Sequence, residues 1–186
     1  GTALTFSVSD GDAVVEKMRI THDGFVGIGT TAPAGIFHIT GDGGTDSYFE
    51  RHSTDVYPAV MHWRKSRGTL ASPTIVADDD TILRIDADGY NGNDYSRCAQ
   101  ILVEVDGTPG DNDMPARMKF ATSADGTESP AVRMTILADG NVGIGTTAPA
   151  KILHVVEDSG NVLIAEFEND HPSLPYGVKI NFSGGS

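Results

Sequence analysis

Apolar and polar residues alternate in short runs along most of this chain, and turn residues separate the runs. Successive side chains of a β-strand point to opposite faces, so the alternation predicts strands with one buried face. Many of the turns contain Asp-Gly, in which Gly accepts positive φ and Asp bonds its own backbone. No stretch keeps the period of an α-helix. The pattern predicts an all-β fold, with runs at residues 2–8, 48–51, 59–64, 82–85, 98–105 and 118–122.

One stretch of this pattern occurs twice. Residues 18–39 align without a gap on residues 134–155, and both copies contain ValGlyIleGlyThrThrAlaPro. The residues before each copy also correspond, so that Phe6 matches Phe120, and the period is about 115 residues. A repeat kept this well indicates one structural unit that is used twice.

The repeated motif carries branched side chains on only one face of its central strand. Val26 and Ile28 point to one face, whereas Gly27 and Gly29 fall on the other. Glycine in a strand costs entropy and often marks the close approach of another backbone. The second copy places Val142, Gly143, Ile144 and Gly145 in the same positions.

Such a short unit cannot bury its own apolar face, because an isolated hairpin is only marginally stable in water. The face must meet either the rest of the chain or the same unit in other copies. A glycine-lined strand with a Val/Ile face suits an axis around which several chains wrap. We therefore predict an interface between chains at Val26, Gly27, Ile28, Gly29, Val142, Gly143, Ile144 and Gly145.

The motif resembles the recurring motif of phage tail-fibre and related tail-appendage proteins. The resemblance depends on Gly24, Thr30 and Pro33, on the interface residues named above, and on Gly140, Thr146 and Pro149 of the second copy. It extends more loosely over the segment between the copies. The resemblance implies an elongated, β-rich homotrimer with interwoven shafts, joined to neighbouring fibre modules. It also implies a place in the virion tail, outside the cell, after assembly in the host cytoplasm.

The two copies of the motif divide the chain into five parts. Residues 1–17 end one β module, residues 18–39 and 134–155 form interchain β-collars, and residues 156–186 begin a further module. Between the collars, residues 40–133 are expected to form a small globular, sandwich-like β-domain, because short alternating runs are divided by turn signals. The chain then corresponds to a window of a longer array. The expected fold class is an all-β fibrous homotrimer in which collars alternate with globular domains.

The composition narrows the choice of partners. The net charge of −13 argues against a nucleic-acid backbone as partner. No apolar run approaches the ~20 residues of a membrane-spanning helix, so membrane insertion is not expected. Cys98 is the single cysteine, which makes a disulfide within the chain impossible, and a buried free thiol is expected there.

Several side chains are of types that form chemical sites. Most aspartates lie beside Gly or Asn, where turn formation accounts for them, so neither enzymatic activity nor catalytic residues are expected. His38 and His154 occupy equivalent positions and would form rings around a trimer axis, but packed or exposed strand histidines are the expectation. No metal and no cofactor are predicted. Asp86, Asp88, Asn91, Asn93 and Asp94 suggest a cation loop, but their spacing is not that of an EF-hand.

The aromatic residues leave a second function open. Tyr90 and Tyr95 flank a predicted turn and are candidates to stack on sugar rings of a host surface polysaccharide. Trp63 lies in an alternating run and is expected in the core. The main interpretation is a structural shaft or spacer segment of a trimeric fibre. The alternatives are a carbohydrate-binding module, a polysaccharide-degrading enzyme, and a cellular surface adhesin or filament.

Overall fold

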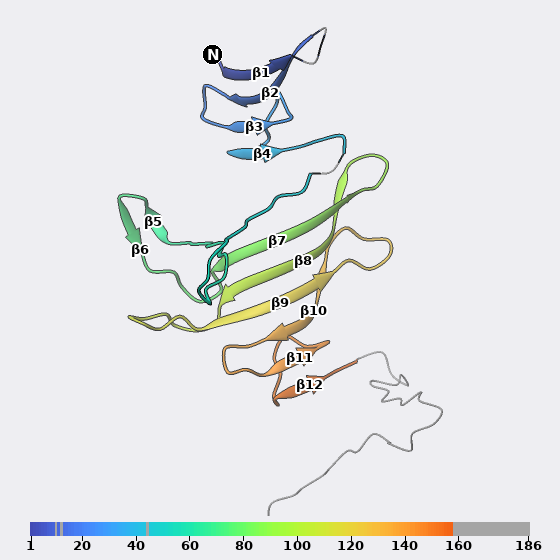
Figure 1. The fold of residues 1–186 in the computed structure, drawn as a ribbon. Coiled ribbons are helices and arrows are strands. Elements are labelled where there is room, and N and C mark those ends of the chain that lie inside the picture. The colour runs from blue at the N-terminus through green and yellow to red at the C-terminus, as the bar shows by residue number, and fades with distance from the viewer. Residues whose placement is uncertain (10, 12, 44, 158–186) are drawn as a thin grey trace, which may run out of the picture. The chain divides into compact units, whose positions relative to one another are not determined.

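The computed structural model describes residues 1–157 except 10, 12 and 44, and within these residues the chain contains strands and no helix (Figure 1). The expected all-β fold is therefore confirmed. The further module expected at residues 156–186 lies, from residue 158 on, outside the described residues. The strands are β1 (Leu4–Ser9), β2 (Val14–Ile20), β3 (Val26–Ile28), β4 (Phe37–Ile39), β5 (Arg67–Thr69), β6 (Ser72–Thr74), β7 (Thr81–Tyr90), β8 (Tyr95–Val105), β9 (Ala116–Thr122), β10 (Ala131–Ile136), β11 (Val142–Ile144) and β12 (Leu153–Val155).

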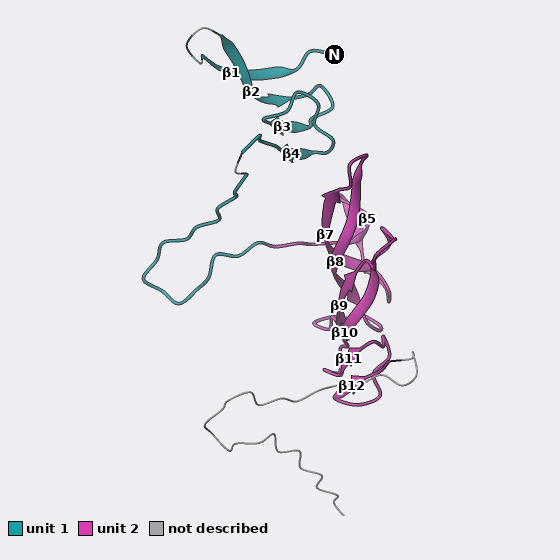
Figure 2. Ribbon diagram, turned by 90° about the vertical axis from the view of Figure 1, so that its right-hand side faces the viewer, with its two compact units in different colours: residues 1–61 teal, residues 62–186 magenta. Residues whose placement is uncertain are grey.

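The chain divides into two compact units, Gly1–Met61 and His62–Ser186 (Figure 2). In the first unit, β1–β4 form a four-stranded sheet in chain order. Its first three strands are antiparallel, and β4 runs parallel to β3. The first copy of the motif is therefore a sheet in itself, extended by the hairpin strand β1 that precedes it.

The second unit is built on one six-stranded sheet of order β12-β11-β10-β9-β8-β7, with β5 and β6 paired as a separate hairpin. The second copy of the motif supplies β10, β11 and β12, so it continues the sheet begun by β7, β8 and β9. Seen close to edge-on, this sheet is a single layer (Figure 2). The sandwich-like layering expected for residues 40–133 is not found among the described residues, because consecutive strands pair side by side in one sheet.

Two of the expected strands are absent from the described fold. Residues 48–51 and 59–64 alternate in sequence but form neither a strand nor a helix. Alternation describes which side chains would share a face, whereas a strand also needs a neighbour that accepts its backbone hydrogen bonds. No described segment of this chain pairs with these two runs, so they remain single extended stretches.

The two copies of the motif have the same backbone hydrogen bonds. In the first copy, the Val26 N–H donates to Ile36 O at 2.8 Å, and the Thr40 N–H donates to Ile28 O at 3.0 Å. These bonds hold the parallel pair β3–β4. The equivalent bonds in the second copy join Val142 N–H to Ile152 O at 2.8 Å and Val156 N–H to Ile144 O at 2.9 Å.

The correspondence continues into the strand before each motif. Phe6 pairs with Met18 and Phe120 pairs with Met134, as the sequence alignment predicts. A β-bulge lies beside each of these pairs. The carbonyl of the extra residue accepts the N–H of the second motif glycine: Gly29 to Lys17 at 3.0 Å, and Gly145 to Arg133 at 2.9 Å.

The glycines of the motif are required by close backbone contacts within the chain. A Cβ on Gly27 would lie 2.8 Å from the carbonyl oxygen of Thr30, and a Cβ on Gly29 would overlap that of Thr40. Gly29 also has φ +74°, a left-handed conformation that side chains rarely adopt. The backbone that approaches these glycines, at Thr30 and Thr40, therefore belongs to the same chain.

The described residues contain only a small core. The buried hydrophobic residues are Val76, Val105 and Ala121. Two expectations of burial are wrong. Trp63 is exposed because its run has no paired strand, and Cys98 is exposed, with its Sγ 3.1 Å from the carbonyl oxygen of Ala87. A chain of this size normally buries far more apolar surface than this.

Replacing Gly29 with Ala tests the backbone requirement. We expect Gly29→Ala to destabilise the first motif by about 1–3 kcal/mol or more, because it adds left-handed strain to an overlap with Thr40 O. Hydrogen–deuterium exchange of peptides over residues 17–40 measures the effect. Gly35→Ala is the control within the same motif, since a Cβ added there would have no atom within 4 Å and the φ of Gly35 is not left-handed. Equal protection in the two variants would contradict this account of Gly29.

Candidate functional site

One face of the four-stranded sheet is apolar from edge to edge. Paired residues of neighbouring strands lie on the same face of a sheet, so the register defines rows of side chains. One row is Leu4, Ile20, Val26 and Phe37, and the next is Phe6, Met18, Ile28 and Ile39. The opposite face carries the row Thr5, Arg19, Gly27 and His38.

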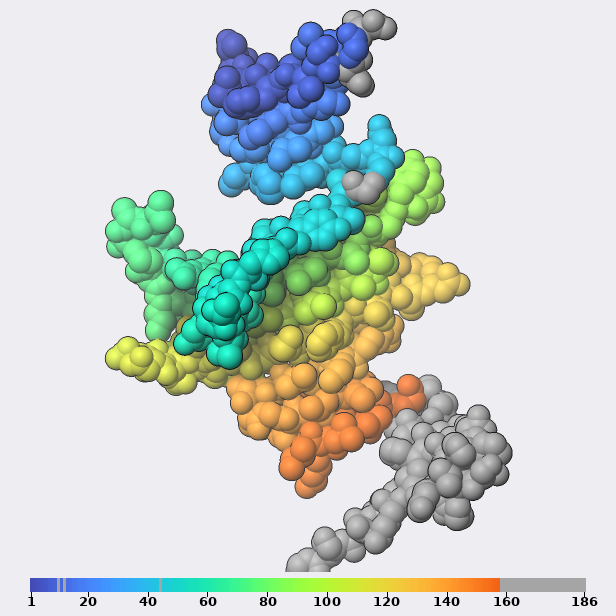
Figure 3. All heavy atoms as spheres, viewed as in Figure 1, coloured from blue at the N-terminus to red at the C-terminus, as the bar shows by residue number. Residues whose placement is uncertain are grey.

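The six-stranded sheet has the same division. Its apolar rows cross all six strands: Leu83, Val103, Met118, Ile136, Val142 and Leu153, and then Ile85, Ile101, Phe120, Met134, Ile144 and Val155. In Figure 3 the atoms of β8 to β12 form a continuous surface from yellow-green to orange. We call these two surfaces, one on each sheet, the apolar faces.

The apolar faces are largely uncovered in the single chain. Phe37 is 65% exposed, and Phe6, Ile85, Ile144 and Leu153 are also exposed. Contiguous apolar surface of this extent is unusual on a soluble monomer and marks an interaction site. The apolar faces are therefore the candidate functional site of the described chain.

The sequence-predicted interface residues divide between the two sides of the sheets. Val26, Ile28, Val142 and Ile144 lie on the apolar faces. Gly27 and Gly143 fall on the opposite side and are buried under their own loops, and Gly29 and Gly145 follow the strand ends at positive φ. The sequence did not reveal that β7, β8 and β9 extend the second apolar face, because alternation gives no register between strands.

The opposite side of the six-stranded sheet is polar and rich in ion pairs. Asp86 lies 3.0 Å from both Arg84 and Arg97 and accepts a hydrogen bond from Gln100 at 2.8 Å. Glu104 accepts from Lys119 at 2.6 Å and from Arg117 at 2.8 Å. These carboxylates therefore have partners within the chain, whereas Arg97 Nε and the buried Thr135 Oγ1 on the same face have no hydrogen-bond partner among the described residues.

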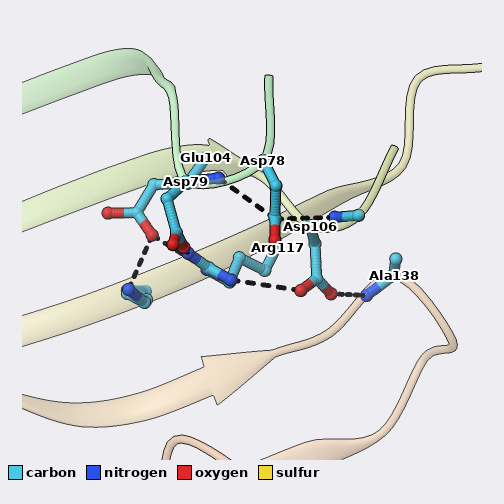
Figure 4. Close-up of polar contacts among 8 residues, drawn as sticks. Asp78, Asp79, Glu104, Asp106, Arg117 and Ala138 are labelled. Carbon is cyan, nitrogen blue, oxygen red and sulfur yellow. Dashed lines mark hydrogen bonds and ion pairs between the residues drawn. The ribbon is translucent and has the colours of Figure 1, made fainter. Parts of the chain in front are cut away.

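Arg117 is the centre of this polar network (Figure 4). Its guanidinium contacts Glu104, Asp106 and Asp79, which come from β8 and from the loops beside it. The hydrogen bond to Asp79 and those to the other two carboxylates raise the pKa of Arg117 against the opposing effect of burial. Burial alone would raise the pKa of Glu104, but the hydrogen bonds from Lys119 and Arg117 lower it below its usual range.

Asp106 attaches the second motif to this network. Its second carboxylate oxygen accepts the backbone N–H of Ala138, in the turn between β10 and β11, at 2.8 Å (Figure 4). In the same loop region, Asp78 accepts the N–H of Gly107 at 2.8 Å. Through Arg117 and Asp106, the polar network fixes the turn of the motif to the strands that precede it.

The motif histidines have the same role in both copies. The N–H of Ala34 donates to Nδ1 of His38 at 3.2 Å, and the N–H of Ala150 donates to Nδ1 of His154 at 3.3 Å. Each ring therefore accepts a bond from its own loop. Across the described residues, no cluster of His, Cys, Asp or Glu is arranged to hold a metal ion.

Tyr90 and Tyr95 pair across the end of the β7–β8 hairpin. Their ring centroids are 5.5 Å apart at an interplanar angle of 60°, and the residues are 63% and 76% exposed. The turn between them is held by Asn91, whose side chain donates to Asp94 and Ser96. Of the cation candidates in this region, Asp86 is bound by arginines and Asp94 by Asn91.

No helix among the described residues is of a length and hydrophobicity to cross a membrane.

Comparison with known proteins gives matches in structure. No protein-family model matches the sequence, and a search of curated proteins found no match. The fold is similar to the carboxy-terminal domain of the bacteriophage T5 L-shaped tail fibre, solved with its intramolecular chaperone domain, with a TM-score of 0.61 and 15% identity. That match covers 95% of this chain and 54% of the T5 chain, so the chain spans about half the length of that neighbour.

A second structure of the same T5 domain matches with a TM-score of 0.56 and 12% identity, over 93% of this chain and 87% of the T5 chain. At these identities the likeness establishes a shared fold. The class defined by the structure is therefore an all-β protein of single-layer sheets with the fold of a phage tail-fibre domain. The shared fold supports a relationship with phage tail fibres.

Removing Arg117 tests whether the polar network stabilises the sheet. Arg117→Met leaves Asp106 and Asp79 without a guanidinium and Glu104 with Lys119 alone, so we expect a loss of about 1–3 kcal/mol in unfolding free energy. Denaturant unfolding at fixed protein concentration measures it. Arg84→Met is the matched control, because the side chain of Arg84 is 54% exposed against 15% for Arg117, and Asp86 keeps Arg97. A similar loss in both variants would show that the network adds nothing beyond surface ion pairing.

Proposed function

We propose that this chain is a structural segment of a homotrimeric phage tail fibre, a shaft or spacer module that supports attachment to the host cell. The observation that carries the proposal is the pair of uncovered apolar faces beside a core of very few buried residues. Sheets with this division need other copies to cover them. The shared fold with the T5 tail-fibre domain supports the choice of a fibre.

In this proposal, the motif strands form collars between chains. Val26 and Ile28 in one sheet, and Val142 and Ile144 in the other, meet their counterparts in the neighbouring copies. Burial of each such side chain contributes about 1.5–3 kcal/mol. The number of three copies comes from the resemblance of the motif to tail-fibre sequences. The fibre is placed in the virion tail, after assembly in the host cytoplasm, with further fibre modules as neighbours.

The role of the segment is then mechanical. The polar side of each sheet is held by ion pairs within the chain, so it faces outward and keeps the assembly soluble. The net charge of −13 on each chain agrees with an outward polar surface at high local concentration. The carboxylates of this surface are engaged by arginine and lysine, so nothing in their arrangement favours a glycan-degrading enzyme.

Charged residues on the apolar faces test the assembly. We expect the wild-type chain to have a mass near three times 19.6 kDa by light scattering. Ile28→Asp combined with Ile144→Asp should dissociate it to monomers, because each change places a carboxylate against apolar partners.

The control carries aspartate on the polar sides of the same sheets. Thr5→Asp lies beside Arg19, and Leu102→Asp lies between Arg84 and Lys119. This variant should keep the mass of the wild type. A trimeric Ile28→Asp, Ile144→Asp protein, or equal dissociation of both variants, would contradict assembly through the apolar faces.

A carbohydrate-binding role is a second candidate, favoured by the exposed Tyr90–Tyr95 pair. Exposed aromatic rings at a hairpin end offer apolar surface to the faces of sugar rings. Beside them, a hollow is lined by Asn91, Ser96 and Glu128, whose side chains bond to one another and leave a carboxylate oxygen of Glu128 to accept sugar hydroxyls. The class of ligand would be a surface polysaccharide of the host.

Replacing both tyrosines tests this candidate. Tyr90→Ala with Tyr95→Ala should reduce binding to a glycan array by about tenfold or more if the rings stack on sugar. Tyr57→Ala is the control, because Tyr57 is also exposed but lies far along the chain from the hairpin. Absence of glycan binding in the wild type, or an equal reduction by Tyr57→Ala, would remove the second candidate.

A further inference from the structure

The segment that leads from the first motif to β5 has an unusual composition for an exposed connection. We call residues 45–66 the arm. The arm contains no strand and no helix, and its residues are exposed. It nevertheless carries many large hydrophobic side chains, each at least half exposed: Tyr48, Phe49, Val56, Tyr57, Val60, Met61 and Trp63.

A solvated linker does not need such side chains. Flexible connections are rich in small, polar and charged residues and poor in aromatics. Large exposed hydrophobic residues gathered in one segment mark a surface that binds a partner. The arm also contains the only tryptophan of the chain, and Trp63 is 58% exposed. The composition therefore indicates that the arm is covered in the functional state.

The bend in the middle of the arm is ordered by local contacts. Asp55 accepts the N–H of Tyr57 at 3.0 Å and a hydrogen bond from Arg51 at 2.6 Å. Arg51 also donates to the Tyr57 carbonyl at 2.5 Å, and its guanidinium lies 5.8 Å from the centre of the Tyr57 ring. Residues 51–57, which precede the run at 59–64, therefore have a defined conformation.

That run has the pattern of a strand without a partner. Met61 and Trp63 alternate with His62 and Arg64. Within the described part of the chain, residues 58–64 make no backbone hydrogen bond. Unpaired N–H and C=O groups of an extended segment pair readily with the edge of a sheet.

An edge of matching character exists in the six-stranded sheet. β7 is the last strand of that sheet among the described residues, so no described strand pairs with its outer side. Leu83 and Ile85 of β7 lie on the apolar face, whereas Asp86 and Asp88 lie on the polar side. A strand added here with Met61 and Trp63 on the apolar face would bring His62 and Arg64 beside these aspartates. The apolar and polar sides of the run and of β7 therefore match in this orientation, and on the polar side His62 and Arg64 would join Arg84 and Arg97, which already pair with Asp86.

We propose that residues 59–64 of the arm add as a strand to the outer edge of β7 in a neighbouring copy of this chain. Met61 and Trp63 then extend the apolar face of that copy, and His62 and Arg64 face its acidic residues. This inference rests on the proposed assembly of copies, and it assigns the arm as an exchanged element between them.

The arrangement of the single chain indicates a neighbour as the acceptor. Lys65 and Arg67, just after the run, both bind Asp80, the residue before β7, at 3.1 and 2.7 Å. These contacts hold residues 65 and 67 at the start of their own β7, and residues 62–64 just before them make no backbone hydrogen bond within the described part of the chain. Each chain offers one arm and one β7 edge, so a closed ring of copies satisfies every arm and every edge.

Trp63 reports on this contact as the intrinsic fluorophore. In the assembled wild-type protein we expect blue-shifted emission and a several-fold lower acrylamide quenching constant than in the dissociated chain, obtained by dilution and with the Ile28→Asp, Ile144→Asp variant. An assembly of trimer mass with freely quenched Trp63 overturns the arm exchange and leaves the proposed fibre intact. Protection of Trp63 that persists in the monomer assigns the arm to its own sheet and also overturns the exchange. A wild-type chain that stays monomeric at all concentrations overturns the fibre assembly itself.

A substitution in the arm tests its contribution and keeps the reporter. Met61→Asp should raise the concentration at which the assembly dissociates by at least about tenfold, because it places a charge on the apolar face of the acceptor. His52→Asp introduces the same charge at an exposed arm residue outside the run and should leave this concentration unchanged. Equal effects of both substitutions would contradict the placement of residues 59–64 on β7.

Discussion

The constraint on which the rest of this structure depends is that a single-layer sheet with one apolar face needs a cover. Both sheets of the described chain have such a face, built from rows that run across every strand. Within the described residues no second layer lies against either face, and the buried hydrophobic residues are few. The hydrophobic free energy that usually stabilises a domain is therefore still available for association.

The polar side explains how the strands of the single chain are held in place. Arg117 joins three carboxylates from separate segments, and Asp106 carries the contact on to the turn of the second motif. Backbone pairing and these ion pairs fix the register of strands, and register determines which side chains share a face. The ion pairs that order the chain and the uncovered apolar side chains thus lie on opposite sides of the same sheets.

Much of this could be predicted from the sequence, and the reasons for the failures are physical. The repeat predicts two equivalent units, and the two copies have matching backbone hydrogen bonds. The match includes the strand before each motif, where Phe6 pairs with Met18 and Phe120 pairs with Met134. The motif glycines correctly indicate close backbone approach, but a sequence does not say which backbone approaches. It proved to be the backbone of the same chain, at Thr30 for Gly27 and at Thr40 for Gly29. The prediction that Trp63 and Cys98 are buried is wrong, because alternation shows which side chains share a face but not whether anything covers that face.

The same distinction gives meaning to the strand that the sequence predicts at residues 59–64 and that the fold lacks. Its alternation is as regular as that of β9, which forms because β8 and β10 lie on either side of it. The run in the arm differs in having no neighbour within the described chain. Exchange of an element between copies requires two things of each chain. One is a run with the pattern of a strand, here residues 59–64, and the other is an edge strand without a partner, here β7. In the proposed exchange, the missing strand and the uncovered faces have one cause, which is that the folding unit is larger than one chain.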